Sequence, residues 1–417
     1  MVGGRIATSS TGQGASRIDR TAPGAASAGS SDPPTELVAM RRFNAIAGLL
    51  LSLTGAACAA QVAPAAPADT WSVSLEALSW RLNDSPIPFP IISDGIIGEP
   101  GTQVLLGNEA LSTGSHRGVR LGIGYTLDAQ FGIEASAFGL QSRRVGGGVA
   151  SSGQVGSIDL ILPYIDAITG AESGSELSQA QIYRGSAYHE VRDRLRGAEL
   201  DLRWTVAADA AWQLDLLGGL RHLDFRESWS LATDSPYLPA FEPDVWQTLD
   251  RFDSRNRYYG VQAGLRAQAA AGRWFGVASL KAAAGTMRQS TDVQGSLRTN
   301  DFTAFGATET FVGGYFAQPS NIGRHTRSQF ALVGEAALEL GLRLGDYATL
   351  GLGYSLLQAD KVLRPGNQVD RRINPTQSTS FTEDPAPTPS GPLAPQFTAH
   401  NSRLRAQGIN LHFAVSF

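Results

Sequence analysis

His222 and Asp224 are the two residues of this sequence best placed to carry out chemistry together. They lie two positions apart, so in a β-strand they would share one face, where an imidazole and a carboxylate could assist a water molecule in hydrolysis. Arg226 and Glu227 lie beside them, and neither a neighbouring acidic pair nor a serine can be placed with them. We interpret these residues as rim charges and predict that the chain is not an enzyme and has no catalytic residues.

The other residues that could bind a metal are too scattered to form a site. His116, His189, His325 and His400 show no ligand spacing, and the sole cysteine, Cys58, falls in a predicted signal segment. No glycine-rich loop joins a strand to a helix, and a net charge of −4 without a basic run is unlike a nucleic-acid-binding protein. We therefore predict no metal, no cofactor and no nucleic-acid partner.

Many charged residues alternate with large apolar residues along the chain. A charge in hydrocarbon is costly, so we expect the apolar parity to face lipid and the charged parity to face the lumen of a barrel. The predicted lumen-lining residues are Glu76, Arg120, Glu134, Glu199, Asp201, Arg203, Asp215, Arg221, Arg266, Lys281, Glu335, Glu339 and Arg343, with His412 on the same face. Acids and bases nearly balance, so we favour a paired network that fills the lumen over a narrow solute path lined by the same groups.

Ten segments carry this alternation and are candidate strands. They cover residues 71–82, 119–127, 131–137, 200–206, 212–221, 259–268, 274–282, 332–344, 348–356 and 409–417. The last segment places Ile409, Leu411, Phe413, Val415 and Phe417 on one parity, and about nine to eleven tilted residues suffice to cross a bilayer. We predict that this strand, which ends on phenylalanine, is the insertion signal recognised by the barrel assembly machinery.

The connections alternate between turns of a few residues and loops of roughly 20 to 50 residues. Every proline after Asp69 falls in a long connection, and none falls in a predicted strand or short turn. Aromatic residues stand at the short-turn ends, where an interfacial girdle is expected, namely Trp71, Phe131, Trp212 and Trp274.

A β-sandwich has no reason for this rhythm, so we predict an all-β transmembrane antiparallel up-and-down β-barrel with long extracellular loops. It has about ten strands, or twelve if residues 158–183 contain a further hairpin. Polar alternation continues past the apolar band in the fifth to eighth strands, so we expect the sheet to project outside the membrane.

The front of the chain has the organisation of an exported protein. Residues 40–60 have the basic, apolar and small-residue regions of a signal peptide, with cleavage expected after Ala59 or Ala60. We predict a disordered prefix at 1–39 with Met40 as the true start, an Ala/Pro-rich spacer at 61–69 and the barrel at 70–417. The predicted location is the outer membrane of a Gram-negative bacterium, with outer-membrane lipid and periplasmic chaperones as partners.

Four motifs in order, GEPGTQVLLG (98–107), DRFDSRNRYYG (250–260), LRPGNQV (363–369) and AQGINL (406–411), carry a family resemblance. The chain resembles the beta-barrel porin-7 (BBP7-type) outer-membrane proteins first noted in planctomycetes. The resemblance implies an outer-membrane barrel and supplies no catalytic residues. Two functions stay open: a porin-like narrow channel for small solutes, and a structural or adhesive surface barrel that displays long loops and has a plugged, non-conducting lumen.

Overall fold

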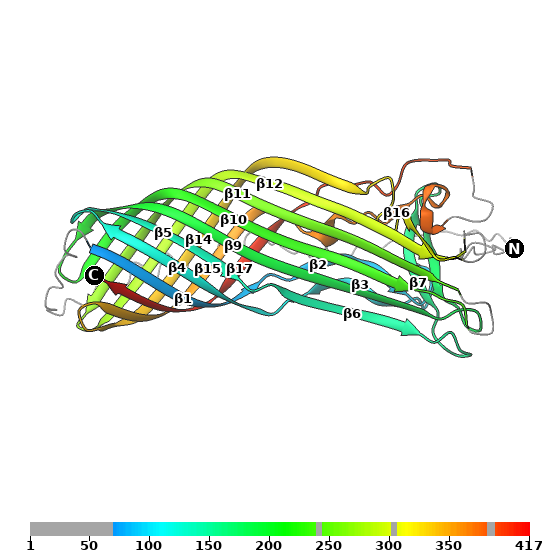
Figure 1. Cartoon of the computed structure of the whole chain (residues 1–417), viewed down its shortest axis with the longest axis horizontal. Helices are drawn as coiled ribbons and strands as arrows, with labels where there is room; N and C mark the ends of the chain where they lie inside the picture. Colours follow the sequence, from blue (N-terminus) through cyan, green and yellow to red (C-terminus); the bar gives the residue numbers. More distant parts are fainter. Residues whose placement is uncertain (1–69, 239–243, 302–306, 382–387) are drawn as a thin grey trace, which may run out of the picture. The chain divides into compact units, whose positions relative to one another are not determined.

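The computed structural model describes residues 70–238, 244–301, 307–381 and 388–417, and most of these residues form β-strands (Figure 1). The predicted prefix, signal peptide and spacer, residues 1–69, lie outside the described residues. No helix among the described residues is long and apolar enough to cross a membrane.

The wall of the barrel consists of antiparallel strands that each pair with the next. They are β1 (Thr70–Leu82), β4 (Ser115–Thr126), β5 (Phe131–Leu140), β9 (Gly185–Ala208), β10 (Trp212–Asp234), β11 (Trp246–Ala271), β12 (Trp274–Thr299), β14 (Gly323–Leu344), β15 (Ala348–Leu363) and β17 (Asn401–Ser416). The last strand pairs with the first, with Val415 opposite Val73, so the ring closes. The predicted all-β up-and-down barrel is confirmed, with ten wall strands in the described part of the chain.

The wall has one apolar face and one polar face around most of the ring. On the outside, Leu121, Leu340 and Leu352 are 59%, 59% and 60% exposed, whereas on the inside Asp215 and Glu335 are buried. This outward apolar belt is about ten residues long on each strand, or about 25 Å after correction for tilt, which matches the hydrocarbon of an outer membrane. The aromatic residues Trp71, Phe131, Trp212 and Trp274 are exposed at its short-turn edge.

Four wall strands, β9 to β12, are 23 to 26 residues long, which is more than a membrane crossing requires. Both the start of β1 and the end of β17 lie at the short-turn end in Figure 1, and the long strands run from that end toward the opposite end of the barrel. Their outer halves carry polar and charged residues on the outward face, so the sheet extends beyond the belt, as the polar alternation indicated.

A second sheet lies at the other end of the barrel and consists of β2 (Ser85–Ser93), β3 (Val104–Leu111), β7 (Leu160–Asp166), β8 (Glu172–Ser178) and β16 (Arg372–Ile373). Strands β7 and β8 are the hairpin suspected in 158–183, but β7 pairs with β2 and β8 with β7, and neither joins the wall. The twelve-strand alternative is therefore wrong. Smaller elements are β6 (Arg143–Ser151) on β9, β13 (Glu309–Val312) on β12, and the short 3-10 helices η2 (Pro365–Gln368), η3 (Pro375–Gln377) and η4 (Thr379–Phe381).

The expected irregular loop after β1 is instead a strand that contains three prolines. Pro86, Pro88 and Pro90 lie in β2, and Pro163 lies in β7, so prolines do occur in strands of the second sheet. The register between β2 and β3 shifts on both sides of Pro90. Such irregular pairing tolerates proline because a bulged position has no ladder bond that requires an N–H donor.

Candidate functional site in the barrel interior

A cavity of about 810 Å³ occupies the short-turn end of the barrel. Turn residues such as Asp128 and Asp209 line its mouth, and Glu335 and Asn410 line its inner end. The predicted lumen residues that line it are Glu76, Arg120, Glu134, Glu199, Asp201, Arg203, Arg266, Lys281, Glu335, Glu339 and Arg343. The other two, Asp215 and Arg221, are buried in the wall beside it.

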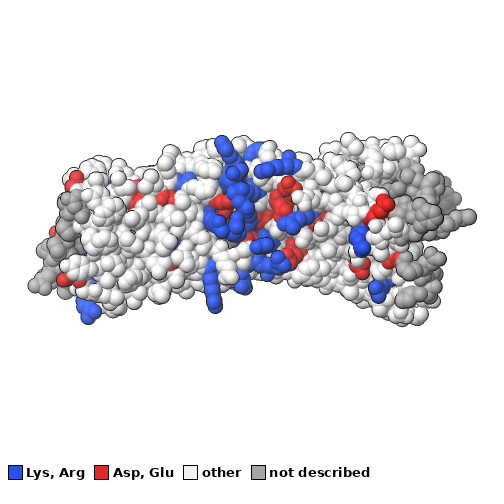
Figure 2. All heavy atoms as spheres, viewed as in Figure 1, with Lys and Arg blue, Asp and Glu red and all other residues white. Residues whose placement is uncertain are grey.

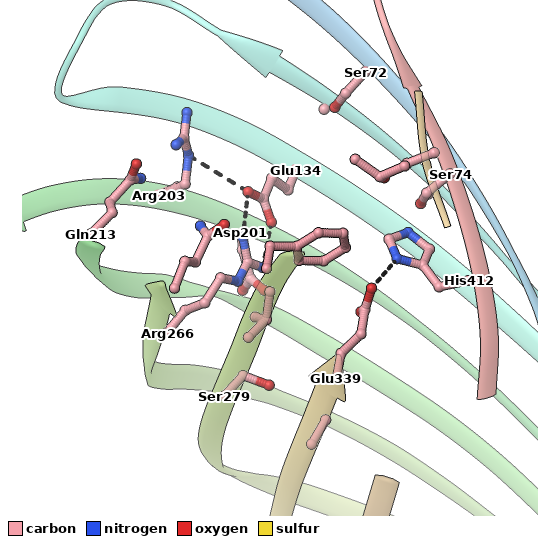
Figure 3. Close-up of a pocket in the computed structure, with 18 of the residues that line it drawn as sticks. Ser72, Ser74, Glu134, Asp201, Arg203, Gln213, Arg266, Ser279, Glu339 and His412 are labelled. Atoms are coloured by element: carbon pink, nitrogen blue, oxygen red, sulfur yellow. Dashed lines mark hydrogen bonds and ion pairs between the residues drawn. The ribbon is translucent and has the colours of Figure 1, made fainter. Parts of the chain in front are cut away.

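Nearly all these groups meet a partner of opposite charge. Near the mouth, Arg266 donates two hydrogen bonds of 2.7 and 2.8 Å to Glu134, and the Arg203 Nε lies 3.6 Å from the same carboxylate (Figure 3). His412 Nδ1 lies 2.7 Å from Glu339. The arrangement is thus a set of local pairs in which different strands supply opposite charges.

A tighter network lies deeper in the cavity. The Lys281 Nζ is 2.9 Å from both Glu199 and Asp201. The Arg221 guanidinium is 2.7 Å from Glu199 and 2.5 Å from Glu335. A second guanidinium, that of Arg120, approaches Glu335 at 3.2 Å. The network therefore links β4, β9, β10, β12 and β14 across the lumen.

Inward-facing glycines make room for this network. A Cβ on Gly351 would overlap the Glu339 Oε1, so any larger residue there would displace the carboxylate that His412 contacts. Among the described residues, Arg343 lines the cavity without an ion pair. It lies close to the short-turn end, where water is available to its guanidinium.

An apolar seal closes the inner end of the cavity. Its larger members are Leu78, Trp80, Leu82, Leu140, Leu195, Leu223, Phe225, Tyr258, Met287, Leu357 and Leu404. Trp80 is completely buried and donates a 2.6 Å hydrogen bond to Asn410, which lines the cavity. The Arg120 guanidinium lies 5.5 Å from the Trp80 ring, so the charged network and the seal are in direct contact.

An outer plug fills the barrel beyond the seal. It consists of the second sheet with residues 313–322 and 364–381, and its apolar side chains pack against inward-facing residues of the wall. Phe89 of β2 meets Trp229 of β10 edge-on at 5.7 Å, and both residues are buried. The interior thus contains three layers in sequence: charged cavity, apolar seal and outer plug.

Two buried anchors tie the outer plug to the wall. Arg364, which precedes η2, donates hydrogen bonds of 2.5 and 2.6 Å to Glu227 of β10, and both side chains are at most 2% exposed. Asn256 of β11 exchanges bonds of 2.7 and 2.9 Å with the backbone of Leu363. The end of β15 is therefore fixed to β10 and β11 before the chain enters the plug.

Asp250 forms a third anchor at the outer end of β11. Its carboxylate accepts hydrogen bonds of 3.1, 2.9 and 2.7 Å from the backbone N–H groups of Tyr315, Phe316 and Ala317. Burial raises the pKa of Asp250 to about 7, although these N–H donors act in the opposite direction. The group lies outside the membrane-spanning part of β11, in contact with the outer plug.

None of the anchor residues was identified as a site residue from the sequence. The interpretation of Glu227 as a rim charge is wrong, because its side chain is buried inside the barrel. Glu227, Asn256 and Asp250 face a lumen that was expected to be polar, but at their level it is packed with protein. The available signal was the resemblance itself, because two of its motifs, residues 250–260 and 363–369, contain three of the anchor residues. Arg364 of the second motif anchors the chain at the point where it enters the plug.

His222 and Asp224 face outward but are not bonded to each other. The His222 Nδ1 contacts the Tyr258 carbonyl oxygen at 2.8 Å, while Asp224 pairs with Arg255 at 2.7 Å and with Arg226. The described residues contain no group of three histidine, cysteine or acidic side chains that could hold a metal. In the predicted insertion strand, Ile409, Leu411, Phe413 and Phe417 are exposed, and Val415 is half-buried.

Residues 85–417 match the sequence profile of the family described as "Putative beta barrel porin-7 (BBP7)". A search of the curated proteins finds no match. Similar solved structures include the outer membrane protease OmpT from Escherichia coli, with 11% identity and a TM-score of 0.40 over 84% of this chain and 97% of that chain. A Pseudomonas aeruginosa FadL homologue has 7% identity and a TM-score of 0.25 over 84% of this chain and 90% of that chain. The P. putida toluene transporter TodX has 8% identity and a TM-score of 0.20 over 85% of this chain and 90% of that chain.

Proposed function

The chain belongs to the beta barrel porin-7 family and is an outer-membrane β-barrel, and from that premise we propose that its lumen is closed to solutes. In this proposal it acts as a structural barrel that displays a packed surface outside the membrane. The family resemblance seen in the sequence is confirmed, but a family name does not establish that this member conducts.

The observation that carries the proposal is the filled interior. The apolar seal and the outer plug lie in series beyond the charged cavity, and their large side chains, including Trp80, Trp229 and Phe316, are completely buried. Protein interiors of this kind leave few voids larger than a water molecule. A hydrated solute would therefore have to displace both layers in order to cross.

A narrow channel is the second candidate, and the charged cavity favours it. The cavity is open toward the short turns and is lined by both acids and bases, as an entry vestibule would be. Conduction would then require the outer plug to leave the barrel, which the three anchors at Glu227, Asn256 and Asp250 oppose.

Planar-bilayer recording of the refolded barrel tests the proposal. We expect the wild type to give no conductance step above the lipid baseline. A variant in which residues 85–111 are replaced by a short Gly/Ser linker removes β2 and β3 while it retains the ring. Adding Trp80→Ala to this variant weakens the apolar seal as well, and we expect the combined variant to conduct. Regular conductance steps from the wild type would refute the closed-lumen proposal and favour the channel.

The proposal also covers the export of the chain and its lack of catalytic activity. We propose that residues 40–60 are a cleaved signal peptide, that the host is a Gram-negative bacterium, and that the chain performs no catalysis. The N-terminal sequence of the protein isolated from outer membranes should begin at Ala60 or Gln61. A mature protein that starts before Met40 would contradict the assignment.

A further inference from the structure

Two rows of arginines border the outward apolar belt on the side away from the short turns. The strand register places Arg196, Asp224, Arg257 and Arg288 in one row across β9 to β12, and Arg194, Arg226 and Arg255 in the next. Figure 2 shows lysine and arginine side chains gathered in a band across the middle of the visible face. All the residues in these rows share the outward parity of the apolar belt.

The positive charge of these rows is only partly balanced by the protein. Asp224 is their single carboxylate, and it pairs with Arg255 at 2.7 Å and with Arg226 at 3.4 Å. Within the described ranges, no ion pair satisfies Arg257 or Arg288, which belong to the row nearer the belt. The crowded guanidinium groups repel one another, and an external anion would relieve that repulsion.

A groove of about 310 Å³ lies beside these rows, between β11, β12 and β14. Three outward-facing arginines line it, namely Arg257, Arg288 and Arg324, together with the hydroxyl groups of Ser290 and Ser328, and no described carboxylate does. Arg327 also lines the groove, but its guanidinium donates hydrogen bonds to Gln289 and Asn401. Guanidinium groups bind phosphate in a bidentate manner, and hydroxyl groups add further donors. The groove therefore has the composition of a phosphate-binding site.

The belt side of the groove fits an acyl chain. The next row toward the short turns contains Tyr259, Thr286 and Phe330, and the row after that contains Val261, Ala284 and Leu332. Tyr259 and Phe330 are 47% and 66% exposed on the outer surface. The Arg288 guanidinium lies 5.9 Å from the centroid of the Tyr259 ring, so a charged group and the apolar surface adjoin directly.

The short turns of an outer-membrane barrel face the periplasm, so the arginine rows lie at the level of the outer leaflet. We propose that this groove and the two arginine rows bind the phosphate groups of an outer-leaflet lipid, whose acyl chains lie on the adjoining apolar belt. The site is on the outer surface of the wall, so it is independent of whether the lumen conducts.

Native mass spectrometry of the full barrel, refolded in neutral detergent, tests this proposal. The probes are lipid A with two phosphates, the same lipid with its phosphates removed, and inorganic phosphate. The test variant is Arg257→Gln/Arg288→Gln. The matched control, Arg251→Gln/Arg298→Gln, removes the same number of arginines from the same two strands, but farther from the belt.

We expect the wild type to bind phosphorylated lipid A, and the test variant to bind it at least about tenfold more weakly, a change of about 1.4 kcal/mol. The control variant should change binding less than about threefold, since charges beyond the groove act only through screened attraction. Equal losses in both variants would overturn the proposal in favour of general charge attraction. Equal binding of the dephosphorylated lipid, or full displacement by millimolar inorganic phosphate, would overturn it as well. Heat-modified gel mobility verifies that each variant is folded.

Discussion

Replacing Arg364 by methionine should release the outer plug from the barrel wall. The guanidinium of Arg364 is buried and donates two short hydrogen bonds to Glu227, and it lies 5.5 Å from the ring of Phe225. Methionine keeps an unbranched apolar stem against that ring but removes the charge and the donors. Glu227 then remains buried without its counter-charge.

The free-energy cost of Arg364→Met follows from the uncompensated carboxylate of Glu227. Removing one partner of a buried ion pair typically costs about 3 to 5 kcal/mol, because the group left behind has lost both its hydration and its partner. Glu227 is completely buried, so little solvent screening reduces this figure. In a local-opening regime, a loss of this size lowers amide protection by more than about 100-fold.

Hydrogen exchange of the folded barrel in lipid vesicles measures the effect. The Leu363 N–H donates to Asn256 at 2.7 Å, so its exchange reports directly on the point where β15 enters the plug. Arg371→Met is the matched control, because Arg371 makes a similar bidentate pair with Glu172 in the plug, but the two side chains are 15% and 30% exposed. Loss of a partly exposed ion pair should lower the stability by no more than about 1 kcal/mol.

The double variant Glu227→Gln/Arg364→Met separates charge from packing. It removes the buried charge, and we expect its local opening free energy at Leu363 to be roughly 2 kcal/mol higher than that of Arg364→Met alone. Equal protection at Leu363 in Arg364→Met and Arg371→Met would refute the reasoning, since burial would then have no bearing on the cost. A double variant as unstable as Arg364→Met would refute the assignment of the loss to the stranded carboxylate.

Three further predictions follow from the interior and the last strand. The pKa of Asp250 in the folded protein, about 7, lies above the usual 3.8. The contribution of this carboxyl to the free energy of unfolding is therefore greatest below about pH 4, falls by about 4 kcal/mol as the pH rises toward 7, and is constant above pH 7. Intrinsic-rate-corrected exchange of the amides bonded to Asp250 should therefore be faster at pH 8 than at pH 5, and Asp250→Asn should flatten this difference. Lys281→Met strands Asp201 beside Glu199 and should lower the free energy of unfolding in vesicles by about 3 kcal/mol, whereas an unchanged urea midpoint would contradict the network. Phe417→Ala should slow insertion and leave periplasmic protein for degradation, since the exposed ring adds little to the fold; normal outer-membrane yield would argue against the insertion signal.

The wall was predictable because lipid imposes a simple rule on each strand. Outside the barrel every side chain meets hydrocarbon, so large apolar residues occupy one parity and charges are forced to the other. The strand ends at the short turns, such as Trp212 and Trp274, agree with the sequence prediction. The pairing of strands in order then follows from the short turns.

The outer plug was not predictable from the same rule. The connection after β1 contains four prolines and was interpreted as irregular, yet Ile87, Phe89 and Ile91 are buried inside the barrel. Their partners, such as Trp229 and Phe252, lie far away in the sequence, in strands whose lumen-facing side was expected to be polar. The sequence of one segment does not indicate which distant segment it packs against, so the contact between β2 and the wall could not be inferred.

The sequence indicated that the sheet projects beyond the belt, but the bounds of these longer strands and their inward apolar residues were missed for a more specific reason, which also locates the membrane boundary. In β10 the apolar side chains are outward at Leu216 and Leu220, but inward at Leu223, Phe225 and Trp229, so the apolar parity reverses within the strand. A periodicity search reads that reversal as the end of a strand, because one phase ends and another begins.

The reversal occurs in several strands at the same level as the arginine rows. In β11 the apolar parity changes between Val261 and Tyr258, next to Arg257, and in β12 it changes between Ala284 and Met287, next to Arg288. Below this level lipid is the apolar medium, and above it the seal and the plug are, so the wall must turn its apolar face from outside to inside. The arginines occupy the outward positions where hydrocarbon ends and headgroups begin, and two independent features of the sequence thus mark one boundary.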